Sequence, residues 1–144
     1  LRVRCYSMEL SEMSAREVLK AFFESYRNQD FESLRLLCTD NITYINPEGL
    51  SSNGIDEFLQ LLKREFESFG VLFEPISWES SVERPSFCYL SWKRGVKFAR
   101  KATLRRVETF GSAFLLKVEK KWQLVHFQQA FSGSYARLFR TRQK

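Results

Sequence analysis

The chain has 144 residues, a length that fits one domain with a sizeable core. Apolar residues make up 44% of it and charged residues 28%, as in an ordinary globular protein, and the formal net charge is +6. No apolar run approaches the ~20 residues that a membrane-spanning helix needs, so we expect no membrane partner.

The cysteines and the single histidine argue against a metal centre. Cys5, Cys38 and Cys88 are odd in number and lack the spacing of a zinc site. We therefore predict no metal and no cofactor, and we expect reduced thiols in a cytoplasmic protein. Residues 1–7 are too polar for a signal peptide, which agrees with that location.

Two helices are predicted in the first part of the chain. Ser14 and Glu17 have the spacing of a capping box, and the apolar stripe that follows predicts a helix ending near Asn28. Asp30 can cap a second, shorter helix. The apolar faces consist of Val18, Leu19, Phe22, Phe23 and Tyr26 in the first helix and of Phe31, Leu34 and Leu37 in the second.

A short strand and a third helix follow. The strand is predicted at residues 41–46 and ends at the turn signature Pro47–Gly49. The helix is predicted to begin at a cap formed by Ser52 or Asn53 and to close at Gly70. Its apolar stripe is Ile55, Phe58, Leu59, Leu62, Phe66 and Phe69.

After the third helix the apolar pattern changes to the period of two that strands show. Strands are predicted at residues 71–80 and 86–92, and Pro75 indicates an edge or a bulge in the first of them.

Residues 93–106 contain seven basic side chains and no acidic one. Their first half is predicted to be a loop and their second half the start of a strand that runs to Glu119, with a helix at 97–109 as the alternative. The run lacks the aromatic interleaving of a single-strand binder and any helix-turn-helix pattern. We therefore expect no specific nucleic-acid binding, only weak, salt-sensitive attraction to polyanions.

The clearest pattern is a hairpin near the end of the chain. Residues 112–118 and 122–128 alternate in polarity around a two-residue turn at Glu119–Lys120 or Lys120–Lys121. One sheet face is predicted to hold Phe114, Leu116, Val118, Val125 and Phe127, and the other Leu115, Lys117, Trp122, Leu124, His126 and Gln128.

Helices followed by a run of strands predict an α+β fold with the helices on one face of a curved sheet. We place the domain at residues 12–134, between a flexible N-terminal segment (1–11) and a basic C-terminal tail (135–144).

Four motifs in this order resemble the nuclear transport factor 2-like superfamily, and within it the SnoaL-like domains. They are the helix end at 26–31, the helix-to-strand passage at 37–42, Asn46–Gly49 followed by a helix at Gly54, and the closing strand at 122–127. The resemblance implies a cone-shaped half-barrel: a curved antiparallel, or mixed, sheet wrapped around three N-terminal helices. It also implies a pocket between sheet and helices, and a homodimer formed through the outer sheet face.

Two positions differ from the ketosteroid isomerases of this superfamily. Those enzymes have a catalytic Asp directly before the proline of the turn, where this chain has Asn46. The tyrosine that stabilises their enolate falls on Phe22. Because the base and the polarising donor of that mechanism are both absent, we predict no activity of that type and no catalytic residue.

The resemblance also places the single histidine. SnoaL-like domains often end in Trp-x-x-Val-His-x-His, and this chain has Trp122, Val125 and His126 but Gln128 in place of the second histidine. His126 is therefore expected at a subunit contact. The predicted dimer interface consists of Trp122, Leu124, His126 and Gln128.

The predicted pocket is mainly apolar with a few polar points. Its candidate residues are Phe23, Tyr26, Tyr44, Asn46, Phe58, Leu62, Phe114, Val125, Phe127 and Gln129, and the alternative is that these aromatic residues fill the core. We predict a homodimeric module that binds a small apolar or aromatic ligand or serves in assembly. The alternative is an isomerase, dehydratase or hydrolase that uses the uncharged groups of Asn46, Tyr44 and Tyr26.

Overall fold

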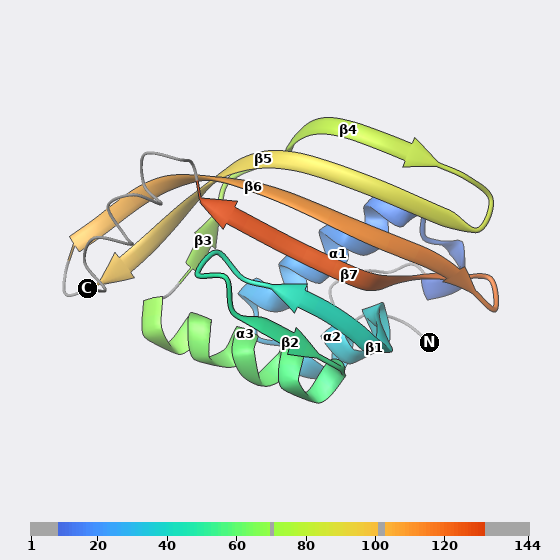
Figure 1. Ribbon diagram of the computed structural model, residues 1–144, viewed down its shortest axis with the longest axis horizontal. Helices are drawn as coiled ribbons and strands as arrows, with labels where there is room; N and C mark the ends of the chain where they lie inside the picture. The colour runs from blue at the N-terminus through green and yellow to red at the C-terminus, as the bar shows by residue number, and fades with distance from the viewer. Residues whose placement is uncertain (1–8, 70, 101–102, 132–144) are drawn as a thin grey trace.

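The computed structural model describes residues 9–69, 71–100 and 103–131, with the helices on one side of a curved, mixed sheet (Figure 1). The helices are a 3₁₀ helix, η1 (Leu10–Glu12), and α1 (Ala15–Arg27), α2 (Phe31–Leu37) and α3 (Ile55–Phe69). The strands are β1 (Cys38–Ile45), β2 (Ser51–Asn53), β3 (Val71–Phe73), β4 (Ser77–Glu83), β5 (Phe87–Arg100), β6 (Thr103–Val118) and β7 (Lys121–Phe131). This architecture confirms the predicted α+β half-barrel around three N-terminal helices.

The helix starts follow from local hydrogen bonds. Ser14 and Glu17 make both bonds of the capping box, and Asp30 caps α2 through the backbone N–H of Ser33. The predicted cap of α3 is wrong. Gly54, at φ +89°, precedes the helix, and the Glu57 carboxylate accepts the N–H of Asn53 instead. A glycine suits this position because side chains rarely adopt positive φ.

The strand order is β2-β1-β7-β6-β5-β3, and β4 pairs with another part of β5. The β1–β7 pair is parallel and all the others are antiparallel. The strand predicted at 71–80 is divided into β3 and β4 around Pro75, which lacks the N–H that a ladder needs. The loop predicted after residue 92 is wrong, as is the helix at 97–109, because β5 continues to Arg100 and β6 begins at Thr103.

A β-bulge in the β6–β7 hairpin corrects the predicted sheet faces. The turn is at Glu119–Lys120, both at positive φ, but the pairing shifts by one residue because Phe114 pairs with His126 and Leu115 with Leu124. Val125 is thus an extra residue, and the alternation reverses beyond it. As a result Leu115, Leu124 and Phe127 share the inner face, whereas Phe114, Leu116 and Val118 lie on the outer face and are exposed.

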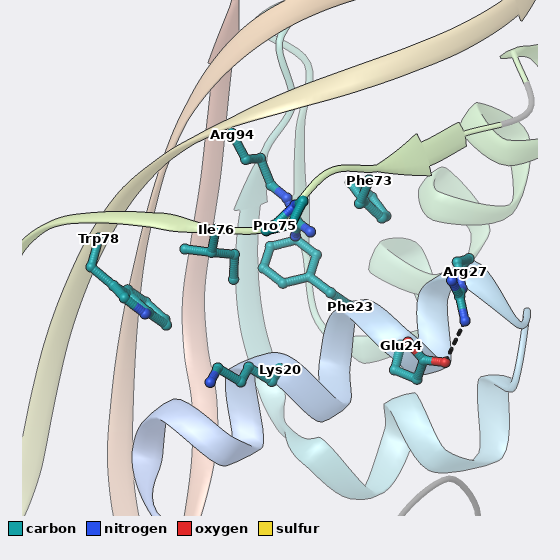
Figure 2. Close-up of a pocket in the computed structure, with 9 residues that line it drawn as sticks. All are labelled: Lys20, Phe23, Glu24, Arg27, Phe73, Pro75, Ile76, Trp78 and Arg94. Atoms are coloured by element: carbon teal, nitrogen blue, oxygen red, sulfur yellow. Dashed lines mark hydrogen bonds and ion pairs between the residues drawn. The ribbon is translucent and has the colours of Figure 1, made fainter.

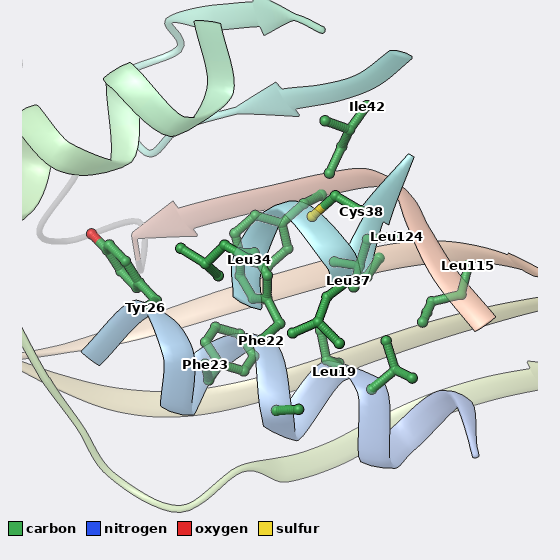
Figure 3. Close-up of a cluster of buried hydrophobic side chains, with 14 of the residues drawn as sticks. Leu19, Phe22, Phe23, Tyr26, Leu34, Leu37, Cys38, Ile42, Leu115 and Leu124 are labelled. Atoms are coloured by element: carbon green, nitrogen blue, oxygen red, sulfur yellow. The ribbon is translucent and has the colours of Figure 1, made fainter. Parts of the chain in front are cut away.

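The core lies between the sheet and the helices, and aromatic side chains occupy much of it (Figure 3). Phe127 is at its centre, with ring centroids 5.1 Å from Phe22, 5.3 Å from Tyr44 and 5.8 Å from Trp92. Gly111 lies against Trp92 so closely that a Cβ there would be 2.3 Å from the indole. The glycine therefore makes room for the buried Trp92.

The boundaries predicted for the domain stay a prediction. Leu10, which lies in the segment predicted to be flexible, is buried in the core. Residues 1–8 of the N-terminal segment, the boundary at 134 and the basic tail lie outside the described residues. Among the described helices, none combines the length and apolar character that crossing a membrane requires.

Candidate functional site

A polar cluster around Glu65 brings three predicted residues together inside the fold. Tyr44 Oη donates to both carboxylate oxygens of Glu65 at 3.2 Å, and Asn46 Nδ2 donates to Oε1 at 3.1 Å. Tyr26 Oη lies 3.5 Å from Oε2, at the limit of a hydrogen bond. The cluster thus joins α1, the end of β1 and α3 around one carboxyl group.

The turn after β1 fixes the orientation of Asn46. Its Oδ1 accepts the backbone N–H groups of Glu48 and Leu50 at 3.0 and 2.8 Å. Gly49, at φ +84°, completes the turn by donating its N–H to the carbonyl of Asn46. Because Oδ1 already has two donors, the amide NH₂ is the group that faces Glu65. Asn46 therefore supports a carboxylate rather than acting as a base.

The surroundings of Glu65 move its titration towards neutral pH. Burial raises its pKa to about 7, and the hydrogen bonds from Asn46, Tyr44 and Tyr26 oppose that effect. Burial, and then the charge of Glu65, raise the pKa values of Tyr26 and Tyr44 well above their ordinary value. The phenols therefore stay protonated as donors, while the carboxyl group can gain or lose a proton near pH 7.

Most of the other predicted pocket residues belong to the core. Phe58, Leu62 and Phe127 are fully buried and pack with Phe22 and Tyr44. Gln129 is half-buried opposite Gly111. Phe114 and Val125 are corrected to the outer face, because the β-bulge reverses the alternation there.

A pocket is present beside this core, between α1 and the sheet (Figure 2). Its volume is about 350 Å³, and Phe23 is the one predicted pocket residue on its wall. We call it the Arg94 pocket. It is lined by Lys20, Phe23, Glu24 and Arg27 of α1, Phe73 of β3, Pro75 and Ile76 of the connection that follows, Trp78 of β4 and Arg94 of β5.

Arg94 differs from Lys93 and Arg106 of the basic stretch because it is buried. Its guanidinium carbon lies 4.5 Å from the centroid of Phe23 and 4.6 Å from that of Phe73, and its Nε and Nη2 donate to the carbonyl of Glu74. Burial lowers its pKa to about 10, so it remains charged at neutral pH. Elsewhere in the stretch, Lys93 pairs with Glu108 and Arg106 with the carboxylate of Glu74.

The outer sheet face carries a groove, here called the outer groove. It is lined by Asn41, Thr43, Ser86, Phe87, Phe114, Leu116, Lys117, Val118, Val125 and His126. His126 Nδ1 is 2.6 Å from Thr43 Oγ1, which orients the imidazole. His126 and Gln128 lie outside as predicted. Leu124 is corrected to the core, where it is fully buried, and Trp122 packs partly against the core.

Glu65 and Arg94 were both missed in the sequence, although each interrupts an apolar pattern. Glu65 is three residues after Leu62 and seven after Phe58, inside the apolar stripe of α3. Arg94 continues the buried alternation of Leu90, Trp92 and Val96. A charge at an apolar position is the signal that would have found them.

The described residues contain no group of three or more His, Cys, Asp or Glu side chains that could hold a metal ion.

Comparison with known proteins agrees with this architecture. A ketosteroid isomerase-like protein from Erwinia carotovora atroseptica aligns with a TM-score of 0.71 and 14% identity, over 88% of this chain and 98% of that one. An NTF2-like protein with a cystatin-like fold from Novosphingobium aromaticivorans aligns with a TM-score of 0.66 and 14% identity, over 85% and 84%. The CaMKII hub of S. rosetta aligns with a TM-score of 0.66 and 14% identity, over 81% of this chain and 93% of that one.

At such identities these structures establish the fold alone. No curated protein matches the sequence. A sequence model described as a SnoaL-like domain matches residues 15–132, which is most of the chain. The chain therefore belongs to the SnoaL-like domain family of the nuclear transport factor 2-like superfamily.

Proposed function

We propose that the chain is a non-catalytic, homodimeric domain that binds a small molecule in the Arg94 pocket. One observation carries the proposal: a pocket of about 350 Å³ combines an apolar wall with charged side chains on its lining. Its lining residues belong largely to α1, β3, β4 and β5, so regular elements hold most of its wall in place. Pockets of this size and character hold small ligands. The buried free thiols of Cys38 and Cys88 support a reducing, cytoplasmic location.

The three tryptophans offer a direct test of ligand binding. Trp78 lines the pocket, whereas Trp122 lies beside the β6–β7 turn. In an NMR titration with a panel of small aromatic and branched aliphatic compounds, we expect the indole N–H signal of Trp78 to shift and that of Trp122 to stay. If no compound at millimolar concentration moves the Trp78 signal, the pocket is not a ligand site.

We place the second copy of the proposed homodimer on the outer sheet face. Phe87, Phe114, Leu116 and Val118 are each 38–43% exposed there and form one apolar patch around the outer groove. Patches of this kind mark protein contacts. The centre of the interface moves from the predicted Leu124 to Phe114, because Leu124 is buried and Phe114 is not.

Sedimentation velocity at low micromolar concentration tests this interface. We expect a dimer that Phe114→Lys converts to a monomer. Leu50→Lys is the matched control, since Leu50 is more exposed but lies in the connection between β1 and β2. If the wild type is a monomer, the proposal of a homodimer is wrong. If Phe114→Lys remains a dimer, the interface lies on another surface.

Acid–base catalysis at Glu65 is a second candidate function, favoured by one observation. The carboxyl group, with a pKa of about 7, lies within hydrogen-bond reach of Tyr44 and Asn46. It supplies the proton acceptor that Asn46 cannot provide. Exchange of the α-protons of small ketones in D₂O, followed by NMR, tests this function. If Glu65 is the base, the wild type exchanges α-protons faster than background and Glu65→Gln does not. If Glu65→Gln still exchanges them at the wild-type rate, Glu65 is not the base.

A further inference from the structure

We infer that the ligand of the Arg94 pocket is an organic anion, a carboxylate attached to a flat or branched apolar group, and that Arg94 binds its carboxylate. This inference rests on the proposed function, because it names the chemical class that the pocket would accept.

The guanidinium of Arg94 has a vacant donor position. Arg94 is 9% exposed, and its Nε and Nη2 are both used on the carbonyl oxygen of Glu74. Nη1 is buried and has no hydrogen-bond partner in the part of the chain that the structure describes. A buried charged donor without a partner is costly, so its presence calls for an acceptor that the protein itself does not provide.

The neighbouring carboxylates do not neutralise Arg94. Glu74 offers its carbonyl to Arg94, but its carboxylate is bound to Arg106 at 2.6 Å. Glu24, the acidic residue that lines the pocket, is bound to Arg27 at 2.6 Å. Figure 2 shows this ion pair on α1, across the pocket from Arg94. Among the described residues, Arg94 therefore has no ion-pair partner.

The charge of the lining favours an anion. Three cations, Lys20, Arg27 and Arg94, face one carboxylate, that of Glu24, which gives the lining a net charge of +2. Lys20 lies on the same helix as Phe23 and has no ion-pair partner among the described residues, so its ammonium group adds to the positive potential of the pocket. A carboxylate is the natural partner of a guanidinium because both are planar and can form charge-assisted hydrogen bonds.

The rest of the lining determines the body of the ligand. Phe23 and Phe73 hold the guanidinium between them, and Pro75, Ile76 and Trp78 continue the apolar wall towards β4. A ring or a branched chain attached to the carboxylate would pack on this wall. The volume of about 350 Å³ is near the lower end for ligand sites, so the ligand is small.

Access to Nη1 requires a small movement. The atom is buried, and the nearby connection between β3 and β4 contains Pro75 and lies outside both strands. Irregular connections of this kind move more readily than strands. We therefore place the opening at Pro75 and Ile76, because Glu74 is held by its hydrogen bonds to Arg94 and Gly95 and by its ion pair with Arg106.

A matched pair of ligands tests the inference. 3-Phenylpropanoate and its neutral amide have the same ring and chain, and isothermal titration calorimetry measures the affinity of each. We expect the acid to bind about tenfold more tightly than the amide, as a charge-assisted hydrogen bond to a buried cation would give. In Arg94→Met the ratio of the affinity for the acid to that for the amide should fall below about twofold. Arg35→Met, an exposed arginine on α2 that pairs with Asp56, should keep the wild-type ratio.

The outcomes separate the inference from the function on which it rests. Equal binding of acid and amide, or a ratio unchanged in Arg94→Met, overturns the anion and leaves the small-molecule pocket standing. Failure of every compound in the panel overturns both. If Arg94→Met does not fold, Arg94→Lys replaces it. It keeps the charge but loses the planar fork, so the ratio should fall to an intermediate value, and an unchanged ratio would contradict the role of Arg94.

Discussion

Glu65 and Arg94 are two ionisable side chains inside one fold, and the rings of Tyr26 and Phe73 connect them. Tyr26 contacts Glu65 through its hydroxyl and packs its ring 5.5 Å from Phe73, whose ring in turn lies 4.6 Å from Arg94. Glu65 receives donors from three side chains, whereas Arg94 has a single carbonyl oxygen. The carboxyl site is thus completed by the protein, and the guanidinium site is left open at a pocket wall. Buried groups normally have partners, so the open one indicates a ligand.

The largest expected effect comes from breaking the completed site. Asn46→Leu removes the donor to Glu65 and also the acceptor of the Glu48 and Leu50 N–H groups. We expect the free energy of unfolding to fall by about 3 kcal/mol, since Glu65 loses a charge-assisted hydrogen bond and two backbone N–H groups of the turn lose their acceptor. Urea denaturation measures this loss. Asn41→Leu on the exposed part of β1 is the control and should stay within about 0.5 kcal/mol. If Asn46→Leu loses as little stability as Asn41→Leu, the hydrogen bonds of Asn46 do not stabilise the turn after β1.

The second prediction concerns pH. The pKa of Glu65 is raised by folding to about 7, so the folded state binds its proton more tightly than the unfolded state does. This contribution is complete below the ordinary carboxyl pKa and is lost as the pH rises through about 7. Between pH 5 and pH 8 the wild type should lose on the order of 2 kcal/mol relative to Glu65→Gln, which cannot titrate.

Denaturation of both proteins at several pH values measures the difference. Glu67→Gln, an exposed position on the same helix, should follow the wild type. If the profiles of wild type and Glu65→Gln run parallel from pH 5 to pH 8, Glu65 titrates normally and the account of its burial fails.

The third prediction compares how much the hydroxyl groups of Tyr44 and Tyr26 each stabilise the fold. Tyr44 Oη lies 3.2 Å from both carboxylate oxygens, and Tyr26 Oη lies 3.5 Å from one. Tyr44→Phe should therefore cost about 1.5 kcal/mol of unfolding free energy and Tyr26→Phe about 0.5 kcal/mol. Tyr89→Phe on the outer face provides the baseline. Thermal denaturation at pH 8, where Glu65 is ionised, gives the order, and the reverse order would mean that Tyr26 is the main partner.

The smallest expected effect is at Arg94. Arg94→Met removes two hydrogen bonds to Glu74 but also removes a buried, incompletely paired charge. Replacing a buried charge by an apolar side chain of similar length is often nearly neutral, so we expect a change below about 1 kcal/mol in the absence of ligand. Chemical denaturation without ligand is the measurement. A loss of several kcal/mol would show that the guanidinium is already fully stabilised, and the contrast with Glu65 would disappear.

The fold was accessible from the sequence because most of its signals are local. The capping box at Ser14, the cap at Asp30 and the apolar stripe of α3 each depend on residues within a few positions of one another. The hairpin turn was likewise predicted at two alternative positions, and the structure has the first of them, Glu119–Lys120.

The sheet faces and the two charged sites depend on contacts between distant segments. One extra residue at Val125 reverses which side chains face the core. The alternation of apolar and polar residues fits a regular hairpin equally well, so it does not reveal the β-bulge. Arg94 was hidden in a run of basic residues, where its place between Trp92 and Val96 was the sole local sign of burial. Glu65 acquires its partners from β1 and α1, so its role becomes visible only when those elements pack together.

The most direct measurement is the crystal structure of the protein in complex with 3-phenylpropanoate. We predict a carboxylate oxygen within hydrogen-bond distance of Arg94 Nη1 and a phenyl ring against Ile76 and Trp78. The Glu65 cluster should be unchanged, because its hydrogen bonds are already complete. Ligand found in the outer groove beside Phe114 and His126, with the Arg94 pocket empty, would contradict the account.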